Sequence, residues 1–218
     1  MIQHVYERAR EAKSVDHVVI ATDDTRILNA AQAFGADARM TSPDHRSGTD
    51  RAAEAAAAFP HEVVVNIQGD EPMIDPASID ACVAGLTDGA PMSTLKTRMT
   101  DPAEIANPNA VKVVTDRDGN AIYFSRHAIP FDREGSAVWF KHLGLYVYQR
   151  EFLLGYSRLP VGPLEIAERL EQLRALENGF RIRVVETGHD SIGVDTPEDL
   201  VNLEKRMALE SNKSGGLK

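Results

Sequence analysis

Strand patterns rich in valine and isoleucine alternate with helical patterns in the first part of the chain, and this alternation constrains the fold most. The strand patterns are HVVIAT (17–22), the weaker ADARMTS (36–42) and EVVVNIQ (62–68), which is the clearest strand of all. Continuous apolar runs of this kind are typical of strands covered on both faces. A β–α repeat with short loops predicts a parallel sheet with right-handed crossovers and ligands at the carboxyl ends of its strands.

The segment from about 105 to 150 has a different pattern. AVKVVT and AIYFSR flank DRDGN, whose Asp118-Gly119 pair is a hairpin signal, and KHLGLYVYQ follows as another strand. We therefore expect an antiparallel insertion in a mixed sheet. One long helix is predicted over 162–178, and RIRVVET (181–187) is the last long strand. The interpretation is a single α/β domain over 1–207, with a polar, frayed tail at 208–218.

Composition excludes several functional classes. Apolar residues make up 43% of the chain, enough for a sizeable core, but no run approaches the roughly 20 residues that cross a bilayer. The formal net charge of -9 argues against nonspecific nucleic-acid binding. Cys82 is the only cysteine, which excludes an intrachain disulfide and a C-x-x-C zinc site, and a packed helix position suits it better than a nucleophilic role. No Walker P-loop or G-x-G-x-x-G fingerprint is present.

Two glycine–aspartate turns are candidate metal sites. In NIQGDEP (66–72), Gly69 permits a sharp turn and Asp70 follows the predicted strand, where a carboxylate suits Mg²⁺. In GVDTPEDL (193–200), Asp195 is a possible second ligand. The alternatives are that Asp70 is a solvated turn residue and that Asp195 only caps the helix that Thr196-Pro197 opens.

A third motif, DHRSGTDR (44–51), places Ser47, Gly48 and Thr49 before a predicted helix. Free amides and hydroxyls at a helix N-terminus can bind an anion or the polar edge of a base. An ordinary turn with Thr49 as the N-cap fits the same residues.

A mixture of donors and acceptors in the second half of the chain suits a polyhydroxylated acid. Arg126 could hold a carboxylate through two parallel hydrogen bonds. On one strand His142 and Tyr146 point the same way, and on the long predicted helix three residues share a face: Glu168, Glu171 and Gln172. The alternatives are a structural histidine and a solvated helix face. Lys112 could reach a phosphate, or lie on an exposed strand.

Seven motifs in one order carry a resemblance to a known family. They are VNIQGDEP, DHRSGTDR, NPNAVKVV, YFSR, KHLGLY, PLE-x₄-LEQLR and GVDTPEDL. Together, over residues 1 to about 207, the chain resembles the 3-deoxy-manno-octulosonate (Kdo) cytidylyltransferases. The resemblance implies a Rossmann-like nucleotidyltransferase fold, mostly a parallel three-layer sheet with an antiparallel insertion that binds sugar and forms the dimer.

The resemblance also implies an activity, a metal and a set of site residues. The activity is transfer of CMP from CTP to Kdo for lipopolysaccharide biosynthesis, by a cytoplasmic, Mg²⁺-dependent homodimer. By motif, Asp70 and Asp195 are the implied catalytic metal ligands. The implied nucleotide site contains Ser47, Gly48, Thr49 and Gln68; the implied sugar-acid pocket contains Arg126, His142, Tyr146, Glu171 and Gln172. The rival interpretations are a cytidylyltransferase for another sugar acid, and an inactive homologue that binds a ligand or partner.

The chain departs from the family pattern at its beginning. Family members open with a strand and a basic, glycine-containing loop before the helix to which residues 1–5 correspond. We therefore expect a gap in the sheet. The hypothesis is that Met1 is an internal methionine, and the alternative is a genuinely truncated or degenerate copy. In-frame sequence upstream that lacks a strand and a basic loop would refute this hypothesis.

Overall fold

The computed structural model describes residues 1–86, 89–190, 193–194, 201, 203 and 205. Their helices and strands follow in the order α1 (Ile2–Glu11), β1 (Val19–Thr22), α2 (Thr25–Ala33), β2 (Asp37–Met40), α3 (Gly48–Ala57), β3 (Val63–Asn66), α4 (Pro76–Ala84), β4 (Met92–Met99), α5 (Pro102–Ala106), β5 (Lys112–Thr115), β6 (Ala121–Ser125), β7 (Trp139–Gln149), α6 (Arg150–Tyr156), α7 (Pro163–Glu168), α8 (Leu173–Glu177) and β8 (Ile182–Glu186). The final helix predicted from Thr196 and the tail at 208–218 lie outside the described residues.

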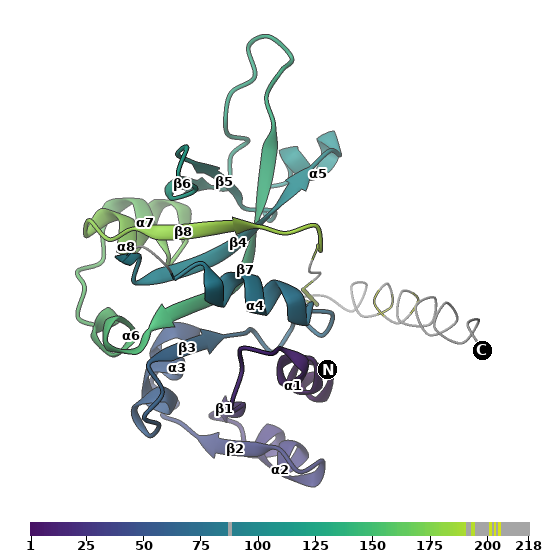
Figure 1. Cartoon of the computed structure of the whole chain (residues 1–218), viewed down its shortest axis with the longest axis vertical. Helices are drawn as coiled ribbons and strands as arrows, with labels where there is room; N and C mark the ends of the chain where they lie inside the picture. Colours follow the sequence, from purple (N-terminus) through teal and green to yellow (C-terminus); the bar gives the residue numbers. More distant parts are fainter. Residues whose placement is uncertain (87–88, 191–192, 195–200, 202, 204, 206–218) are drawn as a thin grey trace.

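Two pairs of strands run parallel, as in an α/β sheet, and β7 runs opposite to β3 and β4. β1 pairs in parallel with β2, and β4 in parallel with β8. β3 and β4 are both antiparallel to β7, so they share one direction. β7 is the longest strand; it pairs with β4 on one edge and with β3 and β5 on the other, which joins the parallel part to the antiparallel β5–β6 hairpin (Figure 1).

The described strands form two sheets. β1 and β2 make a two-stranded sheet, whereas β3 belongs to the six-stranded sheet with order β6-β5-β7-β4-β8, in which it pairs with β7. No ladder joins β1 to β3 in the part of the chain that the structure describes. This separation is the gap in the sheet that the sequence predicts.

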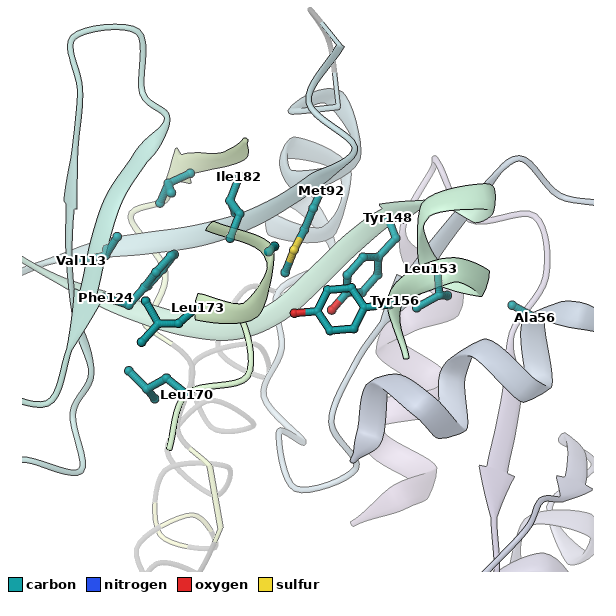
Figure 2. Close-up of a cluster of buried hydrophobic side chains, with 12 residues drawn as sticks. Ala56, Met92, Val113, Phe124, Tyr148, Leu153, Tyr156, Leu170, Leu173 and Ile182 are labelled. Carbon is teal, nitrogen blue, oxygen red and sulfur yellow. The ribbon is translucent and has the colours of Figure 1, made fainter. Parts of the chain in front are cut away.

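Alternate residues of β7 place two hydrophobic cores on opposite faces of the large sheet. One core holds Val147 and is covered by α1 and α4; the other holds Tyr148 and is covered by α3, α6 and α8. Figure 2 shows Tyr148 and Tyr156 side by side in the second core, close to Met92. Both tyrosines are almost fully buried, so this core fixes where α3 and α6 lie relative to β7.

Sequence reasoning missed one strand and predicted one helix wrongly. β4, in the centre of the sheet, was not predicted, because polar residues such as Thr94 and Lys96 interrupt its apolar pattern although both are buried. The long helix over 162–178 is two short helices, since α7 ends at Arg169 in a left-handed conformation (φ 53°, ψ 47°). Glu168, Glu171 and Gln172 therefore do not share one helix face.

Candidate active site

The N-terminus of α3 forms the first wall of the site. Ser47, not Thr49, is the N-cap: its Oγ accepts the N–H of Asp50 at 3.2 Å. The Ser47 hydroxyl also donates to Glu171 Oε1 at 2.7 Å, and the Thr49 hydroxyl donates to Glu171 Oε2 at 3.0 Å. Ser47 and Thr49, implied for the nucleotide, thus contact Glu171, implied for the sugar acid. They lie 124 and 122 positions before it in the sequence.

Glu171 is held in a low-dielectric setting. Burial raises the pKa of its carboxyl, and the hydrogen bonds from Ser47 and Thr49 oppose that shift. Its neighbour Gln172 is only 3% exposed. A carboxylate bound by two hydroxyls can in turn accept a hydrogen bond from a ligand hydroxyl, because each of its oxygens has more than one lone pair.

Gln68 lies against the start of α3. A β-carbon at Gly48 would stand 3.2 Å from Gln68 Nε2 and 3.3 Å from its Oε1. The absence of a side chain at Gly48 therefore lets the Gln68 amide approach the helix N-terminus. The structure brings together all four residues of the implied nucleotide site: Ser47, Gly48, Thr49 and Gln68.

His142 and Tyr146 are neighbours on β7, as predicted. Their ring centroids are 5.4 Å apart, across a register shift opposite Thr94 of β4. Thr94 Oγ1 lies 2.9 Å from His142 Nε2, and Phe124 packs its ring edge-on to the imidazole. Burial lowers the pKa of His142 to about 3, so the imidazole is neutral near neutral pH and can donate or accept a hydrogen bond.

Tyr146 faces the same interior. Burial raises the pKa of its hydroxyl well above the usual value, and the charges of Glu171 and Glu71 act in the same direction. Glu71 is 9% exposed and lies close to Gly144, where a β-carbon would be 3.2 Å from Glu71 Oε1. The neutral phenol can donate a hydrogen bond to a ligand.

Arg126 stands at the end of β6, tied to the residue that ends α7. Its Nε donates to the Glu168 carbonyl at 2.8 Å and its Nη1 to the Pro108 carbonyl at 3.1 Å. The Glu168 carboxylate accepts Ser125 Oγ at 2.6 Å and the Arg126 N–H at 2.9 Å. These bonds fix the guanidinium plane.

Both interpretations of Lys112 are wrong. Its side chain is fully buried, and Nζ donates to the carbonyls of Asn107 at 2.9 Å and Arg126 at 2.6 Å. It therefore supports the Arg126 turn from inside the protein instead of reaching a phosphate or solvent.

Asp70 follows β3 in a turn, and its carbonyl accepts the N–H of Val194 at 2.9 Å. The chain before Asp195 is thereby joined to the QGDEP turn, although Asp195 itself lies outside the described residues. The Asp70 carboxylate itself makes no hydrogen bond to the residues that the structure describes. Among the described residues no cluster of three or more His, Cys, Asp or Glu side chains is suited to a metal.

Comparison with known proteins places these residues in a family. The model of a cytidylyltransferase family matches residues 1–184. The 3-deoxy-manno-octulosonate cytidylyltransferase of Solibacter usitatus is 64% identical over 209 residues, which are 94% of this chain and 83% of that protein. The chain belongs to the 3-deoxy-manno-octulosonate cytidylyltransferase family. The Geobacter sulfurreducens member is 51% identical over 221 residues, covering 95% of this chain and 88% of its own length.

A solved cytidylyltransferase confirms the fold. The structure of a CMP:2-keto-3-deoxy-manno-octonic acid synthetase complexed with CTP superimposes with a TM-score of 0.92. It is 44% identical and covers 96% of this chain and 88% of its own. The predicted nucleotidyltransferase fold is therefore correct.

Sequence reasoning missed two supporting residues in this cytidylyltransferase. Thr94 orients His142, but it lies on the strand that was not predicted. Ser125 donates a hydrogen bond to Glu168. In the sequence, only its place directly before Arg126 in the YFSR motif could have indicated a role in the site.

Proposed function

We propose that this chain transfers CMP from CTP to the anomeric hydroxyl of Kdo, giving CMP-Kdo and pyrophosphate. The observation that carries the proposal is the pair of hydrogen bonds from Ser47 and Thr49 to Glu171. They place a helix N-terminus suited to an anion or a base next to a buried carboxylate suited to sugar hydroxyls. Family membership supplies the identity of the two substrates.

The nucleotide would bind along the start of α3. Backbone amides at a helix N-terminus point toward a bound anion, and the helix dipole favours negative charge there. Gly48 keeps this approach open, and Gln68 offers an amide donor and acceptor in contact range of it. Ser47, Gly48, Thr49 and Gln68 are the proposed nucleotide ligands.

The sugar acid would occupy the space bounded by β7, the end of β6 and the turn between α7 and α8. Arg126 would pair with the carboxylate, because its guanidinium is pre-oriented and permanently charged. His142, Tyr146, Glu171 and Gln172 would bind hydroxyls, which need both donors and acceptors. The neutral His142 leaves Arg126 as the cation that selects for an acid.

Asp70 and Asp195 are the proposed ligands of Mg²⁺. A carboxylate oxygen suits this ion, which needs few protein ligands when phosphates supply the rest. Asp70 suits Mg²⁺ because it is a carboxylate that follows the carboxyl end of β3. The hydrogen bond from the Val194 N–H to the Asp70 carbonyl joins the GVDTPEDL motif to the same turn. Bound Mg²⁺ would neutralise phosphate charge.

The reaction itself is an in-line displacement. The anomeric oxygen attacks the α-phosphorus, its proton is lost, and the bond to pyrophosphate breaks. The protein contributes alignment more than covalent chemistry, since holding two reactants in place lowers the entropic part of the barrier. Glu171 ties the nucleotide wall to the sugar wall, so both substrates would be positioned by one carboxylate.

The test is pyrophosphate release by the purified chain with CTP, Kdo and Mg²⁺, compared with an Asp70→Asn variant. We expect release by the wild type and none above background by the variant, with an unchanged circular dichroism spectrum. Near-normal CMP-Kdo formation by the variant would contradict a metal role for Asp70. A panel of sugar acids with CTP tests the choice of Kdo. If none of the acids leads to pyrophosphate release, the proposed activity is refuted.

Three further parts of the proposal concern the pathway, the compartment and the assembly. CMP-Kdo is an activated sugar, and we place its use in lipopolysaccharide biosynthesis, in the cytoplasm. No helix among the described residues is long and apolar enough to cross a membrane. The enzyme is proposed to be a homodimer.

The projecting segment between β6 and β7 suits a second copy of the chain (Figure 1). Phe131 on this segment is 87% exposed, and a hollow of ≈ 380 Å³ at its base is lined mainly by apolar residues that include Ile105 and Trp139. An exposed phenylalanine close to an apolar hollow is a typical pair of complementary interface features.

A further inference from the structure

Asn66, the last residue of β3, has a buried side-chain nitrogen without a partner. Its Nδ2 makes no hydrogen bond to any residue that the structure describes. A buried donor left unpaired loses its hydration without compensation, so such a group requires an explanation. Asp50 Oδ1, in the first turn of α3, is a buried acceptor in the same condition.

The two unpaired groups lie on facing elements. Along β3, side chains two residues apart share a face. Val64 packs on the core that contains the α3 residues Ala52 and Ala53, and Gln68 lies against the start of α3 at Gly48. Asn66, midway between Val64 and Gln68, therefore faces α3.

Asp50 occupies the matching position on the helix. It precedes Ala53 by three residues, which places both on one side of α3. Ala53 packs on the same core as Val64. Asp50 also acts electrostatically on Glu171, so it lies near the carboxylate that joins the two walls of the site.

Tyr146 connects Asn66 to the proposed pocket. The two residues are directly opposite each other in the β3–β7 ladder. Opposite residues in an antiparallel pair point to the same face of the sheet, with their side chains in contact range. Asn66 thus lies on the same sheet face as Tyr146, a residue already assigned to the ligand.

We propose that Asn66 Nδ2 donates a hydrogen bond to a substrate hydroxyl whose proton is donated to Asp50 Oδ1. A hydroxyl satisfies both orphaned groups at once, because it accepts and donates through the same oxygen. The proposal rests on the proposed function and adds two specificity-determining residues to its site. The hydroxyl belongs either to the sugar acid or to the ribose of CTP, and binding measurements with each ligand alone distinguish them.

The test uses Asn66→Leu, which removes the donor and keeps much of the volume. In the free protein the melting temperature should be unchanged or higher, since no hydrogen bond of the free state is lost. The dissociation constant for one ligand, Kdo alone or CTP alone, should rise about three- to tenfold by calorimetry, as expected for one hydrogen bond. The constant for the other ligand should stay within about twofold.

Asn178→Leu is the matched control, because its Nδ2 donates to the carbonyls of Pro160 at 3.0 Å and Arg174 at 2.8 Å. This variant should melt at a lower temperature and bind both ligands as the wild type does. Asp50→Asn should weaken the same ligand as Asn66→Leu.

Two results would overturn the inference while the proposed function stands. The first is unchanged binding of both ligands by Asn66→Leu when the wild type binds them. The second is a melting temperature as low as that of Asn178→Leu, which would show a structural bond of Asn66 in the free protein. A wild type that binds neither ligand would instead refute the proposed function and the inference with it.

Discussion

Replacement of His142 by glutamine should make the protein less sensitive to acid. The pKa of this histidine falls from 6.5 to about 3 because burial disfavours the imidazolium. Its surroundings are Thr94, Phe124 and Tyr146, none of which carries a compensating negative charge. Glutamine retains a hydrogen-bonding group for Thr94 but cannot take up a proton.

The direction of the change in stability with pH follows from whether the folded or the unfolded state binds the proton. Between about pH 6.5 and pH 3 the unfolded chain protonates this histidine and the folded protein does not, so lower pH favours unfolding. Above about pH 6.5 both states are neutral and the effect vanishes. From about pH 7.5 to pH 5 the difference in proton binding integrates to about 2 kcal/mol of lost stability, an upper figure because the residue keeps some exposed surface.

The measurement is the free energy of unfolding from urea titrations at both pH values. The loss on acidification should be about 2 kcal/mol smaller in His142→Gln than in the wild type. His127→Gln is the control, since the His127 side chain is exposed and folding does not remove it from water. Equal losses in the wild type and in His142→Gln would refute the assignment of a neutral, desolvated imidazole.

Three further predictions follow from packing. Gly162→Ala should destabilise the protein by about 1–2 kcal/mol in urea unfolding, because its β-carbon would overlap the Glu177 carboxylate that caps α7. Gly188→Ala, with open space around it, should not. Cys82 should not react with a thiol reagent at about pH 8 until the protein is denatured, since burial raises its pKa to about 12, and rapid native-state labelling would contradict this. Phe131→Ser should convert the proposed homodimer to a monomer, seen as a lower molar mass by light scattering, and a molar mass equal to that of the wild type would exclude this segment from the interface.

Local signals in the sequence predicted most of the α/β part. The strand patterns EVVVNIQ and HVVIAT contain β3 and β1. Val64 and Val65 of β3 pack against opposite cores, and a strand that packs on both faces needs consecutive apolar side chains. Asp24 caps α2 by accepting the N–H of Arg26. Gly119, with φ of 81°, makes the β5–β6 hairpin turn that Asp118-Gly119 predicted.

The elements that sequence reasoning missed depend on long-range partners. β4 is central and buried, yet Lys96 lies on it, because Nζ donates to Thr115 Oγ1 at 2.9 Å and stands 4.2 Å over the Phe140 ring. Those partners come from β5 and β7, so no local pattern reveals that the lysine is satisfied inside. Likewise, no periodicity relates Ser47 to Glu171; only their motifs placed them in one site.

The turn at Arg169 explains how one short segment serves both walls of the site. In the predicted continuous helix, Glu168 and Glu171 would project from nearly the same side. The left-handed residue instead sends the Glu168 carboxylate to Ser125 and the Arg126 N–H, and the Glu171 carboxylate to α3. A non-glycine residue in this conformation costs about 1–2 kcal/mol, whereas hydrogen bonds to a charged group contribute about 1.5–3 kcal/mol each. The bonds that Glu168 and Glu171 make therefore offset the strain, which is why helical periodicity fails where the sugar acid is proposed to bind.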